Sequence, residues 1–368
     1  MKTKNHSLTA LALQKFKKNT TGVLSFWFVV ICGVIAVFAY FFAPDNSSNA
    51  NQMHLEIHSK KPGFEVLMLS FPSEEKTTQL AFNMLFFGSK NQQTEIPILK
   101  YEISENELTI QTYSENNIES LTKTFPLSKL QGKEISEIIK LKTFYLGTDK
   151  YGRDLLSRML IGTRISFFIG FIAVFISLVI GISVGAMAGY FGGKVDAFIM
   201  WIINITWSIP TLLLVIAITL ALGKGFWQVF IAVGLTMWVE VARVVRGQVM
   251  STKEMQYVEA AKALGFSDFR IIFRHILPNI MAPIIVISAA NFAGAILIES
   301  GLSFLGIGAQ PPIPSWGGMI RDHYAYVIMG KPFLALLPGF AIMLAVLSFM
   351  ALGNSLRDSL DVRLNNAK

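Results

Sequence analysis

Long charge-free stretches of apolar residues constrain the fold of this chain more than any other feature. Five of them exceed about 20 residues, which is enough α-helix to cross a hydrocarbon layer of ~30 Å. They are Thr20–Pro44, Ile165–Gly193, Ala197–Gly223, Ile276–Ile298 and Pro332–Leu356. A sixth stretch, Gly225–Val239, is shorter and ends at Glu240. Because a spanning helix satisfies its own backbone hydrogen bonds, these stretches predict an all-α multi-pass membrane protein with six transmembrane helices.

Composition supports a membrane protein over a soluble one. Of 368 residues, 52% are hydrophobic and only 15% are charged, against about 25% in a typical soluble domain. The net charge of +8 does not indicate a nucleic-acid partner, because it is unevenly distributed. Residues 45–142 hold 10 Lys, no Arg and 13 acidic residues, so this segment is net negative and the excess of positive charge lies elsewhere. Much of it flanks the apolar stretches, as in the positive-inside pattern of membrane proteins.

Basic residues also predict the orientation of the chain. The segment before Thr20 has five Lys and no acidic residue, and Arg243–His275 holds six Lys or Arg against three acidic residues. Both segments lie in the cytoplasm if six helices span the membrane, and the C-terminus returns to the same side. The length of the first apolar run favours an uncleaved first span over a signal peptide. In this arrangement Arg153–Ser166 lies outside, and we expect an amphipathic helix in the outer interface there.

A polar segment of about a hundred residues separates the first two predicted spans. Alternation of polar with β-branched or aromatic residues at Leu55–Ile57, Lys100–Ser104 and Glu107–Tyr113 predicts strands. We therefore expect a small β-rich extracytoplasmic insert at 45–145, after a cytoplasmic N-terminus and first helix at 1–44. A core of membrane helices follows at 146–368. The insert shows no metal-ligand spacing, and we expect His54 and His58 to be surface histidines.

The cytoplasmic connector at about 250–279 has the most informative pattern. Ser251 and Glu254 have capping-box spacing, which predicts that a helix begins there. Small side chains at Ala260 and Ala261 allow close approach to another surface, and Gly265 can end the helix with a positive φ.

A second helix is expected directly after this glycine. Ser267 would cap it, the helix would run over Asp268–Leu277, and Pro278 would end it before the next span. The residues alone leave two interpretations open for the whole connector: a stiff lever at the cytoplasmic surface, or an ordinary amphipathic interfacial loop.

A family resemblance distinguishes these interpretations. Glu259-Ala260-Ala261-x3-Gly265, followed by Leu277-Pro278, resembles the EAA signature of permease subunits in binding-protein-dependent ATP-binding-cassette importers. The general pattern has isoleucine where this chain has His275, and the run Arg274–Asn279 is typical of the dipeptide/oligopeptide/nickel branch. Further matching segments, covering roughly 144–364, are Leu146–Asp154, Ala188–Gly193, Ala242–Gln248, Leu302–Gly306, Gln310–Gly317 and Leu356–Asp361.

The resemblance implies a permease subunit of an ATP-driven importer in the bacterial inner membrane. Peptides fit the branch best, and nickel or another small solute is the alternative substrate. The implied partners are a second permease subunit in a heterodimer, two cytoplasmic ATPase subunits and an extracytoplasmic solute-binding protein. The chain itself would be no enzyme and bind no cofactor, with ATP and Mg²⁺ on the ATPase subunits. ATPase coupling would fall to Glu259, Ala260, Ala261 and Gly265 in the coupling helix, with Leu277 and Pro278 fixing that helix to the fifth span.

Three further residues are candidates for the translocation path or an outer gate. Glu240 and Glu299 are ionisable residues at the ends of apolar runs, where either a path role or a place at the water boundary fits. Trp316 lies in a proline-rich loop that could contact the binding protein or cover the pore, or could be an interfacial anchor.

Two other classes of protein remain as alternatives. An ion-driven secondary transporter would need acidic residues within the spans, and it leaves the EAA segment unexplained. A membrane-anchored sensor would need only one span. The sequence has no G-x4-G-K-[ST] phosphate loop, so ATP hydrolysis is expected on another chain.

Overall fold

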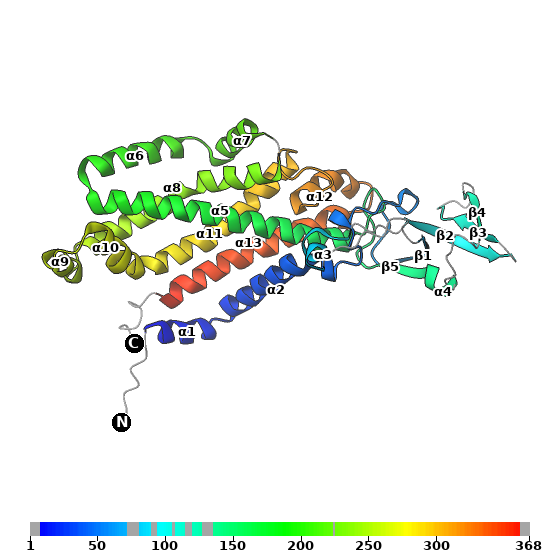
Figure 1. The fold of residues 1–368 in the computed structure, drawn as a ribbon, viewed down its shortest axis with the longest axis horizontal. Coiled ribbons are helices and arrows are strands. Elements are labelled where there is room, and N and C mark those ends of the chain that lie inside the picture. The colour runs from blue at the N-terminus through cyan, green and yellow to red at the C-terminus, as the bar shows by residue number, and fades with distance from the viewer. Residues whose placement is uncertain are drawn as a thin grey trace, which may run out of the picture. The chain divides into compact units, whose positions relative to one another are not determined.

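The structure is a computed structural model whose helices and strands are labelled in Figure 1. The chain divides into two compact units. The structure describes residues 8–71, 81–89, 94–104, 107–114, 120–126, 135–223 and 225–360. The first unit comprises residues 1–33, 166–310 and 340–368, and the second comprises 34–165 and 311–339. Three long helices, α2, α5 and α13, each contribute residues to both units.

Helices make up the first unit and run into the second. Their bounds are α1 (Leu8–Lys18), α2 (Thr20–Phe42), α5 (Leu155–Phe191), α6 (Gly193–Ser208), α7 (Thr211–Leu222), α8 (Phe226–Lys253), α9 (Gln256–Ala263), α10 (Asp268–Ile271), α11 (Met281–Phe304) and α13 (Phe333–Leu360). Many large apolar side chains on these helices are exposed, as expected of helices that face lipid.

Five helical segments in the described chain are long and apolar enough to cross a membrane, and one of the six predicted spans is interrupted. The predicted run Ala197–Gly223 forms two helices, α6 and α7, whose axes differ by 92°. The bend lies at Ile209 and Pro210, where Ile209 is extended (φ −90°, ψ 127°) because a residue before proline is driven out of the α region. The described chain therefore has six spans only if this bent pair counts as one.

The predicted interfacial helix at Arg153–Ser166 is instead the beginning of α5. That helix continues without a break into the second predicted span. Its first turns are buried within the second unit, with Leu155, Ser157 and Ile161 at most 1% exposed. Burial of both polar and apolar side chains around the helix rules out an amphipathic surface helix here.

The second unit contains the β-rich insert predicted between the first two spans. Five antiparallel strands form one sheet in the order β4-β3-β2-β1-β5. Their bounds are β1 (Phe64–Phe71), β2 (Thr94–Ile103), β3 (Glu107–Thr112), β4 (Thr122–Pro126) and β5 (Ile139–Phe144), and α3 (Ala81–Phe87), α4 (Ile135–Ile138) and α12 (Trp316–His323) complete the unit. Alternate residues of β1 enter two apolar clusters, since Met68 packs with Ile57 and Leu69 packs with Ile98.

Two expectations for this insert are wrong. Leu55–Ile57 is a short 3₁₀ turn and not a strand, because its backbone bonds locally, from Ile57 N–H to His54 O at 3.0 Å. His54 is buried at 7% exposure, with Nε2 3.7 Å from a Glu95 carboxylate oxygen, whereas His58 is exposed as expected. Burial holds the pKa of His54 below its usual range, opposed in part by Glu95.

Candidate functional site

Helix α9 carries the residues of the predicted coupling element. Val258 and Ala261 are buried, whereas Glu259, Ala260 and Lys262 are exposed, so one face of α9 packs on the protein and the other faces away from it. The expected helix start at Ser251 and Glu254 is wrong. Helix α8 runs through Ser251 to Lys253, Glu254 follows its end, and α9 begins at Gln256 after a short turn.

The turn after α9 is fixed by Gly265. Its φ is +76°, a left-handed conformation that L side chains avoid, as the sequence predicted. The Gly265 N–H donates to Lys262 O at 2.9 Å and the Phe266 N–H donates to Ala261 O at 3.2 Å. These two bonds form a Schellman motif, which satisfies the last carbonyls of the helix and sets its direction.

An apolar cluster joins α9 to the long helices of the first unit. Val258 and Ala261 pack in one buried cluster with Val249 of α8 and Ile272 of the following segment. Tyr190 at the end of α5 belongs to the same cluster. Close-packed side chains therefore connect α9 to α5 and α8.

Polar contacts of Tyr190 reinforce this junction. Its hydroxyl donates to Asp268 Oδ1 at 2.6 Å, at the start of α10. The ammonium groups of Lys253 and Lys262 lie over its ring, 5.7 and 5.4 Å from the centroid. Cations over an aromatic face are attracted to its π-electrons, so Tyr190 links α5, α8, α9 and α10.

Pro278 does not end a helix as predicted. The chain passes from α10 through a π-helical turn at Ile272–Ile276 and a 3₁₀ turn at Leu277–Ile280 directly into α11. Pro278 lies at the beginning of the 3₁₀ turn, where its missing N–H removes no regular helical bond. The segment from Asp268 to the end of α11 is thus one continuous helical path, and half-buried Leu277 and exposed Pro278 lie within it.

A ridge of glycines, not identified from the sequence, brings α5 against α8. A Cβ added at Gly181, Gly185 or Gly189 would lie 2.8, 2.5 or 2.7 Å from a backbone carbonyl oxygen of α8. Only glycine permits this approach, as in small-xxx-small packing of membrane helices. The spacing of four residues between these glycines can be read from the sequence, and it could have predicted the close contact between the helices.

Two arginines of α8 form polar contacts with α6, the first helix of the bent pair. Arg246 donates to Asp196 Oδ2 at 2.6 Å, and Arg243 donates to Asn204 Oδ1 at 2.9 Å. The Arg243 guanidinium also lies 3.7 Å from the centre of the Trp207 ring. The Ala242–Gln248 segment, which matches the family pattern, therefore supplies the side chains that bind α6 to α8.

The two candidate acids differ in environment. Glu299 is fully buried in α11, where Ser303 Oγ donates to it at 2.7 Å and Ser166 Oγ of α5 at 3.4 Å. Glu240 of α8 is exposed and lines a cavity of about 210 Å³ within the first unit, together with Asn291 of α11. The structure therefore places Glu240, and not Glu299, at an open surface.

Trp316 is buried in the second unit. Only 3% of it is exposed, and its Nε1–H donates to Met159 O of α5 at 3.1 Å. Its ring packs so closely on Gly162 that a Cβ added there would lie 2.9 Å from Trp316 Cδ1. Ser315 caps α12 by accepting a hydrogen bond from the Gly318 N–H at 3.2 Å. The indole thus fastens α12 to the beginning of α5.

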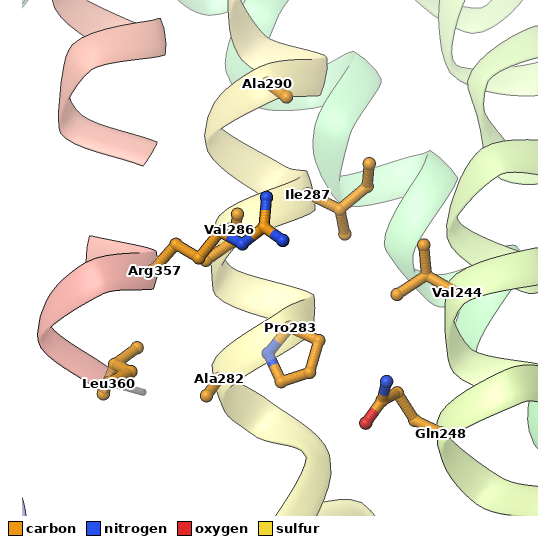
Figure 2. A pocket seen from close by; sticks show the side chains of 9 residues that line it. All are labelled: Val244, Gln248, Ala282, Pro283, Val286, Ile287, Ala290, Arg357 and Leu360. Carbon is orange, nitrogen blue, oxygen red and sulfur yellow. The ribbon is translucent and has the colours of Figure 1, made fainter. Parts of the chain in front are cut away.

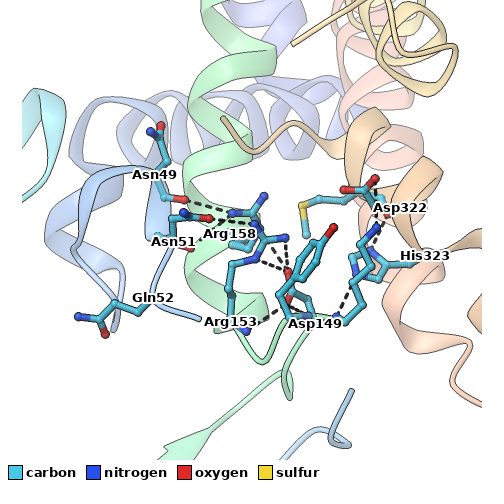
Figure 3. A network of polar contacts seen from close by, with 12 residues as sticks. Asn49, Asn51, Gln52, Asp149, Arg153, Arg158, Asp322 and His323 are labelled. Carbon is cyan, nitrogen blue, oxygen red and sulfur yellow. Dashed lines mark hydrogen bonds and ion pairs between the residues drawn. The ribbon is translucent and has the colours of Figure 1, made fainter. Parts of the chain in front are cut away.

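A buried ionic network in the second unit surrounds Asp149 (Figure 3). Its carboxylate receives Arg153 Nη2 at 2.6 Å and lies 3.7 Å from Arg158 Nε, and Arg153 also donates to Asn51 Oδ1 at 2.9 Å. Buried charges of this kind need such partners. The Leu146–Asp154 motif thereby ties the segment after α2 to the beginning of α5.

Helix α12 joins the same region through Lys150 and His323. Lys150 Nζ lies 3.5 Å from Asp322, and the Lys150 backbone N–H donates to His323 Nε2 at 3.4 Å (Figure 3). His323 Nδ1 lies 2.7 Å from Met319 O and so carries a proton, whereas Nε2 accepts from the Lys150 N–H and carries none, which corresponds to a neutral ring. Burial holds the pKa of His323 below its usual range, and the bond to Met319 opposes this.

Comparison with known proteins places these features in a family. A family model described as "Binding-protein-dependent transport system inner membrane component" matches residues 181–366. A second, "N-terminal TM domain of oligopeptide transport permease C", matches residues 7–62.

Two related proteins and one solved structure are among the individual matches. A dipeptide transport system permease protein of Alkalihalophilus pseudofirmus is 40% identical over 259 residues, covering 70% of this chain and 80% of that protein. A glutathione transport system permease protein of Pectobacterium atrosepticum is 40% identical over 222 residues, covering 60% and 73%. A solved structure of an inward-facing methionine ABC transporter is 18% identical with a TM-score of 0.45, covering 55% of this chain and 96% of that chain.

Proposed function

This chain belongs to the family of inner membrane components of binding-protein-dependent transport systems, and we propose that it is the permease subunit of an ATP-driven importer of peptides. The substrate class rests on relatives whose names specify dipeptide and glutathione transport, and on the match to the oligopeptide permease domain. The several apolar helices agree with a multi-pass inner-membrane protein.

Its partners follow from this role. The permease would pair with a second permease subunit, two cytoplasmic ATPase subunits that bind ATP and Mg²⁺, and an extracytoplasmic solute-binding protein. The basic segment before Thr20 and the Arg243–His275 connector would both face the cytoplasm, with the C-terminus on the same side. The insert at 45–145 would then lie outside, ahead of the permease core at 146–368.

The exposed face of α9 would be the docking surface for the ATPase, and this single observation carries the proposal. Glu259 and Ala260 point away from the protein, while Val258 and Ala261 fix the helix from behind. Closure of the ATPase pair would move α9, and the Tyr190 junction would pass the movement to α5 and α8. Alternating access would result, with Leu277 and Pro278 carrying the same movement into α11.

The three candidate residues of the translocation path or outer gate would have different roles: Glu240, Glu299 and Trp316. Exposed Glu240 would face the substrate directly. Buried Glu299 would order α5 against α11 through Ser166, and Trp316 would support the outer end of α5 from within the second unit.

Replacement of Gly265 by leucine tests the coupling role. A side chain at φ +76° costs about 1–2 kcal/mol, so the variant should redirect or unfold α9. We expect Gly265→Leu to reach the membrane at normal levels while transport and substrate-stimulated ATP hydrolysis fall at least about tenfold.

Gly247→Leu is the matched control for this variant. Gly247 lies in α8 without a positive φ, and an added Cβ there meets no atom within 4 Å. Normal transport by Gly265→Leu at normal membrane levels would refute coupling through α9. Failure of ATPase subunits to co-purify with the wild-type chain would refute the importer itself and favour an ion-driven transporter.

A further inference from the structure

Two cavities in the first unit share one wall. A cavity of about 470 Å³ lies between α8, α11 and α13, with Gln248 and Arg357 as its polar lining (Figure 2). The cavity of about 210 Å³ beside Glu240 and Asn291 lies between α6, α7, α8 and α11. Ala290 of α11 lines both, so the two cavities are neighbours along the same pair of helices.

The cavities lie in line along α8. Glu240, Val244 and Gln248 follow one another at intervals of four residues and therefore share one face of the helix. We name the two neighbouring cavities together the α8–α11 groove. Glu240 and Gln248 are eight residues apart, which corresponds to ~12 Å along the helix axis.

Opposite charges stand at the two ends of this groove. Glu240 and Arg357 are both exposed, and no ion pair joins either of them to another described residue. Arg243, the cation nearest to Glu240 in sequence, is engaged with Asn204 and the Trp207 ring.

The groove also contains a buried donor that lacks an acceptor. Asn291 is only 1% exposed, lines the cavity of Glu240, and its Nδ2 has no hydrogen bond to any described residue. An unsatisfied buried donor costs free energy that a ligand oxygen would recover. This atom therefore indicates a polar ligand.

We propose that the α8–α11 groove binds a short zwitterionic peptide during transport, with the peptide's N-terminal ammonium at Glu240 and its C-terminal carboxylate at Arg357 and Gln248. Asn291 Nδ2 donates to a backbone carbonyl oxygen of the peptide. An extended chain covers 3.3–3.6 Å per residue, so ~12 Å accommodates three to four residues. The inference rests on the proposed peptide importer and adds the polarity and length of its substrate.

Peptides with blocked termini test this polarity. The complete transporter is reconstituted in lipid vesicles with its solute-binding protein, and uptake of trialanine, N-acetyl-trialanine and trialanine amide is measured. The affinity of the solute-binding protein for each peptide is measured separately. The ratio of uptake of trialanine to uptake of each blocked peptide is then divided by the corresponding ratio of affinities. We expect Glu240→Gln to abolish a preference of at least about tenfold for trialanine over the N-acetylated peptide. Arg357→Gln should abolish the matching preference over the amide and leave the first preference intact.

Asp358→Asn is the control for a charge change beside Arg357 that does not line the groove. Unchanged ratios in both groove variants would overturn the proposal. So would loss of subunit co-purification in them, because the groove would then be covered by the second permease subunit. A wild-type transporter that takes up none of the three peptides refutes the peptide importer, whereas wild-type uptake with unaltered variant ratios refutes only the groove.

Discussion

At the scale of single residues, burial lowers the pKa of His54 and His323 and so favours their neutral form. His323 accepts a hydrogen bond from the Lys150 N–H on Nε2, which is open to it only while the ring is neutral. Burial lowers the pKa of His323 in the folded protein, so the folded state binds fewer protons than the unfolded state. The stability contribution is fully present above the unfolded pKa of about 6.5 and is lost as the pH falls through the folded value.

We therefore predict that acid destabilises the second unit through His323. Lowering the pH from about 7.5 to 5 should lower the thermal unfolding temperature. The free energy of unfolding should fall by up to ~1.4 kcal/mol per pH unit for one proton. His323→Gln retains an acceptor without a titrating ring and should reduce this pH dependence. His58→Gln alters an exposed histidine and should not. Equal pH dependence in the wild type and His323→Gln would show that His323 does not titrate with unfolding.

Residue-scale properties differ in how far a sequence reveals them. The positive φ of Gly265 was predictable because a glycine after a helix has a local steric reason to adopt it. Burial of His54 and Trp316 was not, since both are covered by segments distant in the chain, Glu95 for one and Met159 for the other. Local patterns carry no information about such neighbours.

At the scale of helices, the glycine ridge gives α5 and α8 the close contact through which, under the proposed function, movement of α9 would pass. A Cβ at Gly185 would lie 2.5 Å from Ala242 O and 3.0 Å from Val245 Cβ, so Gly185→Val must separate the helices. We predict a loss of about 1–3 kcal/mol in unfolding free energy, together with reduced substrate-stimulated ATP hydrolysis. Thermal unfolding and ATPase assays on the purified complex measure both.

Gly33→Val in α2 is the control, because an added Cβ at Gly33 meets nothing within 4 Å. A Gly185→Val complex as stable and as active as this control would mean that α5 and α8 do not act as one body.

The existence of the helices was predictable and their irregularities were not. Charge-free runs identify membrane helices because lipid excludes charge, which is a property of each segment alone. The same runs do not predict the 92° bend at Pro210. Nor do they predict that the helical path continues through Pro278 as a 3₁₀ turn. Proline permits a bend, a break or a 3₁₀ turn, and packing against α8 and the Ile272–Ile276 turn decides among them.

At the scale of the whole molecule, the insert has two parts with separate attachments. The sheet leaves and rejoins the chain at one place, where the Gly63 N–H donates to Phe144 O at 3.0 Å. The segment before it is attached independently: Arg153 donates to Asn51 Oδ1 at 2.9 Å, and the Lys60 N–H donates to Thr148 Oγ1 at 2.9 Å. These bonds involve only residues that lie outside the sheet.

Two deletions separate these parts. Excision of residues 64–143 leaves its ends together and keeps the ionic network, so we predict at least roughly half of the normal membrane level, with partner ATPase subunits still co-purifying. Deletion of residues 50–140 also removes Asn51 and Lys60, which leaves a buried cation without its amide partner and should abolish accumulation. Immunoblots of membrane fractions and co-purification distinguish the outcomes. If both deletions accumulate equally, the network around Asp149 does not hold α5, and if neither does, the sheet itself is required for folding of the helical core.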